Sequence, residues 1–187
     1  MPSFDRPVDL TIPPSPWVMR WSALIKEGGV VLDIAAGHGR HTRALRALGR
    51  TIVAVDVDVS GLSDLKTEPH VEVVAADLEA LPWPFEGRKF GGIVVTNYLH
   101  RPHFPLLVSA LENNGVLIAE TFGQGNERLG RPRNPNFLLE QGELLRAFEP
   151  HLHIIAYEHG EESVPRPAVR QRICAIKGPG PYMLPEI

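Results

Sequence analysis

A single cysteine, Cys174, is present among the 187 residues, so the sequence excludes an internal disulfide bond and fits a reducing compartment. No apolar run approaches the ~20 residues that span a membrane, and the N-terminus lacks a charged-then-apolar signal. The formal net charge is only −3, too small to draw the chain to nucleic acid or an anionic membrane. We therefore expect a cytoplasmic monomer or homodimer with no membrane or nucleic acid partner.

The motifs of several enzyme classes are also missing, because there is neither a Ser-His-Asp nucleophile elbow nor a Walker loop. Histidines recur in three closely spaced pairs: His38 and His41, His100 and His103, and His151 and His153. No cysteine or carboxylate pattern completes a metal site around them, so we predict no metal. Cys174 lies in the apolar run 172–176 and is predicted to be a buried, unreactive thiol.

The chain is organised around residues 30–42, which combine a strand, a turn of small residues and the start of a helix. Apolar residues lead into Asp33 and indicate a buried parallel strand. Small residues including Gly37 and Gly39 follow, where the backbone can turn tightly and a ligand can approach. Helical spacing then continues to Gly49. This order is typical of nucleotide-binding α/β units, although an ordinary strand-to-helix turn also favours glycine.

Two further strands end in an acidic residue. The β-branched run 51–55 is followed by Asp56, about 20 positions after the turn, where a carboxylate can accept hydrogen bonds from a ribose diol. Residues 71–76 form a third apolar run, and Asp77 follows it. The alternative for both acids is an ordinary solvent-exposed position at a strand end.

In this order, the residues resemble the class I S-adenosylmethionine-dependent methyltransferases. In that family an acidic-x-Gly-x-Gly-x-Gly loop holds the methionine part of the cofactor, and an acid after the second strand holds the ribose. Here Ala35 replaces the first glycine, so we expect that the loop does not need a positive φ at residue 35. Thr42 stands where a dinucleotide dehydrogenase needs its third glycine, which disfavours a nicotinamide cofactor.

The resemblance implies S-adenosyl-L-methionine as the cofactor and assigns a contact to each of its parts. Loop amides near Gly37 and Gly39 would receive the carboxylate, and Asp33 would order the loop or meet the ammonium group through water. Asp56 would bind the ribose and Asp77 the adenine amino group. The cofactor-binding residues are predicted to be Asp33, Ala35, Gly37, Gly39, Asp56, Val57, Asp77, Leu78 and Asn97.

The remaining pattern alternates helices and strands. We predict helices over 16–25, 60–66, 102–112 and 140–148, a loop at 81–85, a turn at 113–115, and strands over 90–96, 116–119, 151–159 and 167–177. The fold class is therefore α/β, with a doubly wound, seven-stranded, mostly parallel sheet that carries an antiparallel C-terminal strand. We divide this single domain into an arm and helix (1–27), a cofactor-binding core (28–122), a lid loop (123–136) and a C-terminal helix and strand pair (137–187).

Candidates for catalysis and substrate binding follow the fourth and fifth strands. His100 is a candidate base and Tyr98 a candidate pocket wall, while the Asn/Asp-Pro-Pro-aromatic motif of amino-group DNA methyltransferases is absent. The proposed lid is rich in arginine and has no periodicity, which is typical of functional or disordered loops. Arg101, Glu120, Arg131 and Arg133 are predicted to bind a small anionic acceptor. The alternative is that these arginines are solvated or are neutralised by Glu120 and Glu127.

The sequence therefore predicts methyl transfer from S-adenosylmethionine to a small molecule. Residues 136–145 and the strands after them further resemble the small tellurite-resistance-type branch, whose acceptors include chalcogen oxyanions. Two alternatives stay open: a methyltransferase-fold protein that binds the cofactor without catalysis, and a nicotinamide-dependent oxidoreductase.

Overall fold

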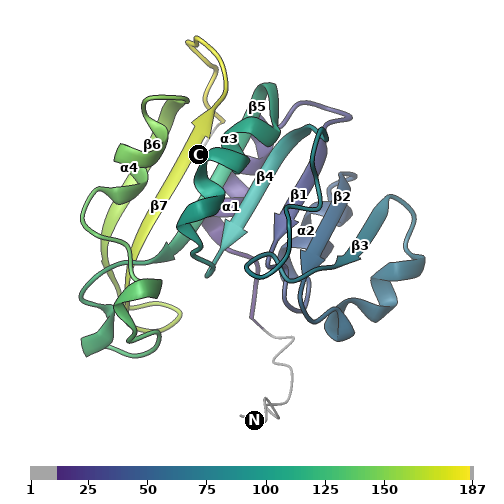
Figure 1. The fold of residues 1–187 in the computed structure, drawn as a ribbon. Helices are drawn as coiled ribbons and strands as arrows, with labels where there is room; N and C mark the ends of the chain where they lie inside the picture. Colours follow the sequence, from purple (N-terminus) through teal and green to yellow (C-terminus); the bar gives the residue numbers. More distant parts are fainter. Residues whose placement is uncertain (1–11, 186–187) are drawn as a thin grey trace.

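Runs of β-branched and other apolar residues form a single sheet in the computed structural model, which describes residues 12–185 (Figure 1). The strands are β1 (Val30–Ile34), β2 (Thr51–Asp56), β3 (Val71–Ala75), β4 (Phe90–Thr96), β5 (Leu111–Phe122), β6 (His153–Glu162) and β7 (Ala168–Ile176). Their order is β3-β2-β1-β4-β5-β7-β6, and β7 runs antiparallel to both of its neighbours. The predicted seven-stranded, doubly wound α/β sheet is confirmed.

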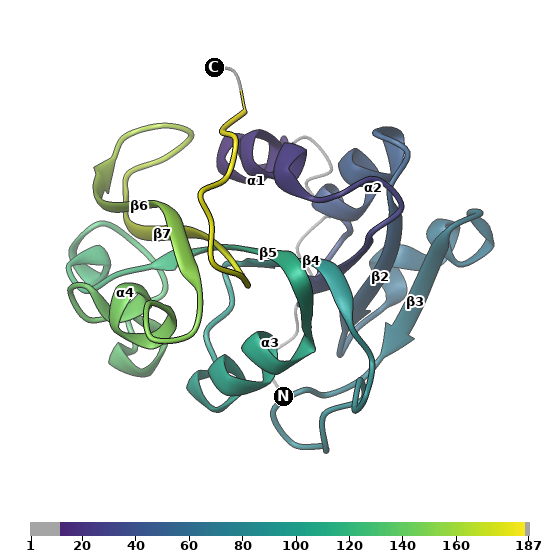
Figure 2. The same cartoon turned by 90° about the horizontal axis from the view of Figure 1, so that it is seen from above.

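Helices cover both faces of this sheet, as Figure 2 shows from above. The α-helices are α1 (Pro16–Trp21), α2 (Arg40–Ala47), α3 (Phe104–Ala110) and α4 (Glu143–Phe148). Short 3₁₀ segments are η1 (Ser22–Leu24), η2 (Ser60–Thr67), η3 (Arg101–His103), η4 (Asn126–Arg128) and η5 (Pro135–Phe137). α1 and α2 lie on one face, over a core that includes Trp17 and Leu45, while α3 and α4 lie on the other, over Phe90 and Phe148.

The helix α1 begins where the sequence predicts, because Ser15 is its N-cap and Pro16 its first residue. It ends at Trp21 and continues only as the 3₁₀ turn η1, short of the predicted end at residue 25. Ser15 is also bound from outside, because its N–H donates to Nε2 of the buried His41 at 3.0 Å. This bond fastens the start of α1 to the first turn of α2.

Three local predictions differ from the structure or are refined by it. The predicted turn at 113–115 is wrong, because β5 already begins at Leu111. Asn114 takes a φ of +62° beside a register shift between β4 and β5, a conformation that asparagine tolerates better than most residues. The 60–66 helix is present as the 3₁₀ segment η2, and residues 81–85 form turns, as predicted.

Within residues 12–185, no helix is both long enough and apolar enough to cross a membrane. The predicted division into arm, core, lid and C-terminal part stays a prediction, and residues 1–11 of the arm lie outside the described residues.

Candidate functional site

The β1–α2 loop turns through three residues in the left-handed region of backbone conformation. Ala35 has a φ of +52°, Gly37 of +56° and Gly39 of +73°. The expectation that residue 35 avoids a positive φ is therefore wrong. The next amide, that of Ala36, donates to the Val55 carbonyl at 3.0 Å, so the chain stays bonded to β2 until it turns away. Alanine accepts this conformation at a cost of about 1–2 kcal/mol.

Asp33 supports this loop from below. It is buried at the end of β1, and its Oδ2 accepts a hydrogen bond of 2.6 Å from the Thr42 hydroxyl in α2. Burial raises the pKa of Asp33 to about 6, and the Thr42 hydrogen bonds partly oppose that rise. Of the two roles predicted for Asp33, ordering the loop is the one seen in this geometry.

The loop amides are not disposed as predicted. Gly37 N–H donates to Oδ2 of Asp56 at 2.8 Å, and Gly39 N–H donates to the Ala36 carbonyl at 2.9 Å. Both glycine amides therefore already donate hydrogen bonds within the protein and are not free to bind the cofactor carboxylate. The first N–H groups of α2, those of Arg40 and His41, are the ones that no intrahelical bond can satisfy. The helix dipole there also favours an anion.

Asp56 and its surroundings leave room for a nucleoside. Its second carboxylate oxygen accepts from Asp58 N–H at 3.0 Å, and each oxygen keeps a further lone pair. Val57, next in the chain, is an apolar side chain that is 69% exposed. A Cβ added at Gly37 would meet no atom within 4 Å, so the space beside the loop is open. These features fit a ribose on Asp56 and an apolar ring against Val57.

Asp77 and Leu78 stand at the next strand end. The Asp77 Oδ1 accepts from the N–H groups of Glu79 and Ala80, both at 3.0 Å, so the carboxylate also shapes its own loop. Leu78 is buried, and its carbonyl is 2.9 Å from Nε2 of His103. His103, which the sequence did not single out as a site residue, thereby fixes the segment that would cover an adenine ring.

Tyr98 and His100 follow β4 and meet around a cavity of about 20 Å³. Among the described residues, the buried Tyr98 hydroxyl has no hydrogen-bond partner. Burial raises the pKa of Tyr98, and the charges of Glu79 and Asp77 add to the rise, so the phenol keeps its proton. Nδ1 of His100 lies 4.0 Å from a Glu79 carboxylate oxygen.

Asn97 begins a charged network that crosses the rest of the sheet. Its Oδ1 accepts a hydrogen bond of 2.7 Å from Arg170 Nη1, and Arg170 Nε donates to Glu162 at 2.7 Å. Arg172 also bonds Glu162, and its Nε donates to the buried Glu120 at 3.0 Å. Glu120, a predicted substrate ligand, is therefore paired with β7. The sequence did not indicate Arg170 or Arg172, because their partners are distant in the chain.

The Arg101 guanidinium is held by hydrogen bonds within the protein. Its Nε and Nη2 donate to the two carboxylate oxygens of Glu143 at 2.6 and 3.0 Å. The same guanidinium donates to the carbonyls of Asn136 at 2.8 Å and Leu138 at 3.0 Å. The N–H groups of Arg101 thus mostly donate to α4 and to the end of the proposed lid. The ion-pair alternative holds for Arg101, with Glu143 rather than Glu120 or Glu127 as the partner.

The proposed lid, residues 123–136, is folded into turns whose two ends lie side by side. Leu139 N–H donates to the Phe122 carbonyl, and Gln124 N–H donates to the Leu139 carbonyl, both at 2.9 Å. Asn126 is buried, donates to the Pro132 carbonyl at 3.2 Å and accepts from Val169 N–H at 3.1 Å. Arg131 and Arg133 are exposed on this loop. The segment has the form of an Ω-loop at the edge where β4 and β5 end (Figure 1).

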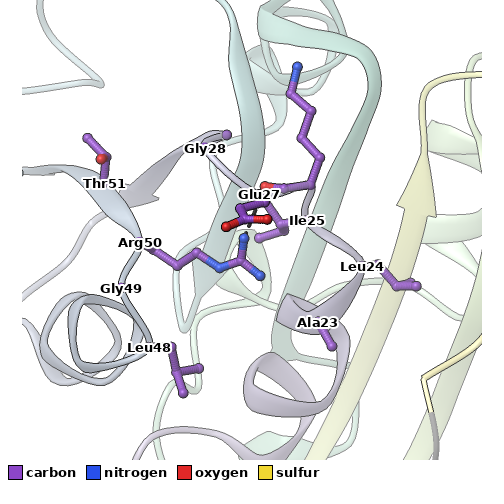
Figure 3. Close-up of a pocket in the computed structure, with 11 residues that line it drawn as sticks. Ala23, Leu24, Ile25, Glu27, Gly28, Leu48, Gly49, Arg50 and Thr51 are labelled. Carbon is purple, nitrogen blue, oxygen red and sulfur yellow. Dashed lines mark hydrogen bonds between the residues drawn. The ribbon is translucent and has the colours of Figure 1, made fainter.

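A cavity of about 610 Å³ lies at the opposite edge of the sheet, between residues 23–29 and 48–51 (Figure 3). These residues flank the starts of β1 and β2, whereas the candidate site follows their ends. Arg50 donates hydrogen bonds here to the carbonyls of Lys26 at 3.0 Å and Ser22 at 3.3 Å. None of the predicted site residues lines this cavity.

No group of three or more metal-ligating side chains occurs within the described part of the chain. Cys174 is buried, and burial raises the pKa of its thiol to about 12, which agrees with the prediction of an unreactive side chain.

Comparison with known proteins shows a match to one domain family and a similarity of fold to solved structures. Residues 31–114 match the family model described as a methyltransferase domain. TehB from Haemophilus influenzae superposes with a TM-score of 0.69 over 83% of this chain and 60% of its own, at 16% identity. No curated protein sequence matches the chain significantly.

Two enzyme complexes share the fold. The 1,6-didemethyltoxoflavin-N1-methyltransferase of Burkholderia thailandensis, with bound 1,6-didemethyltoxoflavin and S-adenosylhomocysteine, has a TM-score of 0.67 and 17% identity over 88% of this chain and 77% of its own. The glycopeptide N-methyltransferase MtfA, complexed with S-adenosylhomocysteine, has a TM-score of 0.59 and 18% identity over 83% of this chain and 86% of its own.

The sheet order is that of the Rossmann-like methyltransferase fold of these structures, and residues 31–114 match the methyltransferase-domain model. At 16–18% identity the similar structures show the fold alone, so the resemblance to the tellurite-resistance-type branch stays a prediction. The chain spans less than two thirds of the length of TehB.

Proposed function

We propose that the protein binds S-adenosyl-L-methionine at the carboxyl ends of β1–β4 and transfers its methyl group to a small molecule. The observation that carries this proposal is the Gly37–Asp56 contact of 2.8 Å, which holds the small-residue loop beside a strand-end carboxylate. Two complexes of the same fold contain S-adenosylhomocysteine, which supports the choice of cofactor. The crevice between β1 and β4, where the strand order reverses, is where open α/β sheets bind ligands.

Each part of the cofactor meets a chemically suitable group in this proposal. Asp56 accepts from the ribose hydroxyls, Val57 covers one side of the adenine and the Asp77–Leu78 segment the other. The amides of Arg40 and His41 receive the carboxylate in place of the glycine amides. S-adenosylmethionine, when bound, supplies an electrophilic methyl group on a positively charged sulfur. The chain's own contribution is alignment, which can be worth roughly 7–11 kcal/mol in such reactions.

The acceptor in this proposal is small and anionic. Arg131 and Arg133 remain the predicted contacts from the Ω-loop, and both are exposed. Arg40 adds a third guanidinium, half-buried at the start of α2, where it donates to the Pro13 carbonyl at 3.2 Å. Burial lowers the pKa of Arg40, while Glu120 opposes that effect. A partly desolvated guanidinium is a strong partner for an oxyanion.

Tyr98 and His100 keep distinct proposed roles at the acceptor. The phenol of Tyr98 stays protonated at neutral pH, so it can donate a hydrogen bond to the acceptor. His100 is the candidate base, and its Nδ1 lies 4.0 Å from a Glu79 carboxylate oxygen. An acceptor that arrives as an anion needs no base, so His100 matters only for acceptors that must lose a proton.

Isothermal titration calorimetry tests this function directly. We expect S-adenosylmethionine and S-adenosylhomocysteine to bind more tightly than NADH, and tighter NADH binding would contradict the assignment. Mass-spectrometric detection of S-adenosylhomocysteine formed in the presence of an acceptor panel then separates an enzyme from a non-catalytic cofactor-binding protein. The lid is tested by hydrogen exchange, because S-adenosylhomocysteine should increase protection across residues 123–136.

A further inference from the structure

Asn97 occupies the position where β4 delivers the chain into the crevice. It is the first residue after Thr96, has a φ of +54° and is exposed. Its N–H donates to the Glu120 carbonyl at 3.0 Å, which continues the pairing of β4 with β5 by one residue. β4 and β1 are the strands between which the sheet order reverses, so the Asn97 side chain stands where ligands bind in this class of fold.

The orientation of the Asn97 amide is chemically determined. Arg170 Nη1 lies 2.7 Å from Oδ1, and a guanidinium only donates, so the amide oxygen must face Arg170. The amide NH₂ group therefore points away from Arg170. Among residues 12–185 it has no hydrogen-bond acceptor. Asn97 thus presents two N–H donors to the crevice, while Arg170 engages its amide oxygen.

Arg170 is itself held firmly enough to impose this orientation. Its side chain is 11% exposed, and its Nε donates to Glu162 at 2.7 Å. The guanidinium also stacks over the ring of Phe122, 4.3 Å from the ring centre. Glu162 is bonded in turn to Arg172, which bonds Glu120. Turning the Asn97 amide would place its NH₂ group against a cation and forfeit the 2.7 Å bond.

From this arrangement we propose that Asn97, oriented by Arg170, selects acceptors that carry an anionic oxygen and disfavours acceptors that carry an ammonium group. The donors of Asn97 bind lone pairs on a non-reacting oxygen of the acceptor. An ammonium group would have to share the amide oxygen with Arg170 and would meet the charge of that guanidinium. Asn97 is thereby a specificity residue rather than a support for the cofactor backbone, and Arg170 is its positioning residue.

The charge balance of the transfer fits such an acceptor. A lone pair of the nucleophile forms the new bond to the methyl carbon, while the sulfur–carbon bond breaks and its electron pair stays on sulfur. The sulfonium charge disappears, and an anionic nucleophile loses its negative charge in the same step. A thiolate has no proton to lose, whereas a thiol releases its proton to solvent as it reacts, and Asn97, which binds a non-reacting oxygen, takes no part in that proton transfer. This inference rests on the proposed cofactor site, and its test measures the two separately.

Three thiols that share one nucleophile and differ in charge provide the test: 3-mercaptopropionate, 2-mercaptoethanol and cysteamine. Each is titrated into protein saturated with S-adenosylhomocysteine while the ¹⁵N–¹H resonances of the Asn97 side-chain amide are followed. We expect mercaptopropionate to shift these resonances at concentrations at least tenfold lower than cysteamine does. No shift with mercaptopropionate, or an equal response to both, would overturn the proposal.

Variants separate orientation from simple loss of structure. Asn97→Asp replaces the donors with acceptors at constant shape, and it should abolish the preference for mercaptopropionate in binding and in methyl transfer. Arg170→Gln leaves the amide free to turn and should reduce the preference at least fivefold, whereas Arg146→Gln, on the exposed face of α4, should keep it. Calorimetry with S-adenosylhomocysteine is the control. If that ligand fails to bind the wild type, the proposed function fails; if it binds while both site variants keep the preference, only this inference fails.

Discussion

The carboxyl edge of the sheet has two halves that are stabilised by different kinds of bond. At the ends of β1–β3, the cofactor half, the acids bind backbone amides of the strand-end loops: Asp56 binds the amides of Gly37 and Asp58, and Asp77 those of Glu79 and Ala80. At the ends of β4–β7, the ion-pair half, charged side chains bind one another across strands. The difference matters because a carboxylate that accepts hydrogen bonds from two amides keeps lone pairs for a ligand. A paired arginine and glutamate mainly hold each other in place.

The largest effect should come from breaking the ion-pair half. Arg172→Gln leaves Glu120, whose side chain is 5% exposed, without its partner. Removing one member of a buried pair costs about 3–5 kcal/mol, because the other charge stays desolvated. Urea unfolding monitored by circular dichroism gives the free energy of unfolding. The matched control is Arg88→Gln, whose exposed pair with Glu72 should cost less than about 1 kcal/mol. Equal losses in the two variants would show that Glu120 is not effectively buried.

The cofactor half should lose ligand affinity instead. Asp56→Ala removes the proposed ribose acceptor, a charge-assisted interaction worth about 2–3 kcal/mol. The dissociation constant for S-adenosylhomocysteine should therefore increase roughly 30- to 160-fold. Calorimetry measures it. Asp58→Ala is the control, because that exposed carboxylate two positions on accepts only from its own loop at Ser60. Wild-type affinity in Asp56→Ala would mean that the ribose lies elsewhere.

Two buried groups of the cofactor half should give opposite pH slopes. Burial lowers the pKa of His41 to about 3, so below the unfolded value of 6.5 only the unfolded chain gains a proton, and stability falls as the pH falls. Burial raises the pKa of Asp33 to about 6, so between 6 and 3.8 the folded chain holds the extra proton, and stability rises as the pH falls. Each slope is about 1.4 kcal/mol per pH unit, and in that window they cancel.

Single variants should expose each slope in turn. In Asp33→Asn, the free energy of unfolding should rise with increasing pH, by about 1.4 kcal/mol per pH unit between pH 4 and 6. In His41→Gln, it should fall with increasing pH at a similar rate. The double variant should remove both of these contributions. Urea unfolding at a series of pH values measures all four proteins. A slope of the same sign in both single variants would contradict the burial of one of the two groups.

The smallest effect should follow from Arg101→Gln in the ion-pair half. The variant releases α4 and the end of the Ω-loop, and because Arg101 is 39% exposed the loss in stability should stay near 1 kcal/mol. Hydrogen exchange should nevertheless accelerate across residues 134–140, where Arg101 holds two carbonyls. Arg146→Gln, which breaks an exposed pair within the same region, should leave that exchange unchanged.

The two halves also differ in how much of them the sequence predicts. The strands β1–β4 and the acids that follow β2 and β3 are encoded by short local runs, so their positions could be predicted within a residue or two. The positive φ of Ala35 was missed because it depends on the bond from Ala36 to Val55, a neighbour only in the sheet. In the ion-pair half, Asn97 and Arg170 are 73 residues apart. Their contact requires the register of β5 against β7, which no local pattern specifies.

The same limit explains the error over Arg101. Topology predicts that the arginine after β4 and the arginine-rich loop after β5 lie near each other, and Arg101 does contact the end of that loop at the Asn136 carbonyl. Topology gives no information on which carboxylate a flexible guanidinium meets, and here that carboxylate is Glu143 at the start of α4, 2.6 Å from Arg101 Nε. The sequence therefore predicts the edge of the sheet at which Arg101 lies, but not the carboxylate with which it pairs.

Cys174 makes the molecule convenient for optical measurements of loop motion. It is the only thiol in the chain and is fully enclosed within β7, so at neutral pH a maleimide has no accessible thiolate to attack. A cysteine introduced in place of the exposed Arg131 would thus carry a dye at a single, known place while the native Cys174 is kept. Its anisotropy with and without S-adenosylhomocysteine would report directly whether the Ω-loop tightens when the crevice is filled.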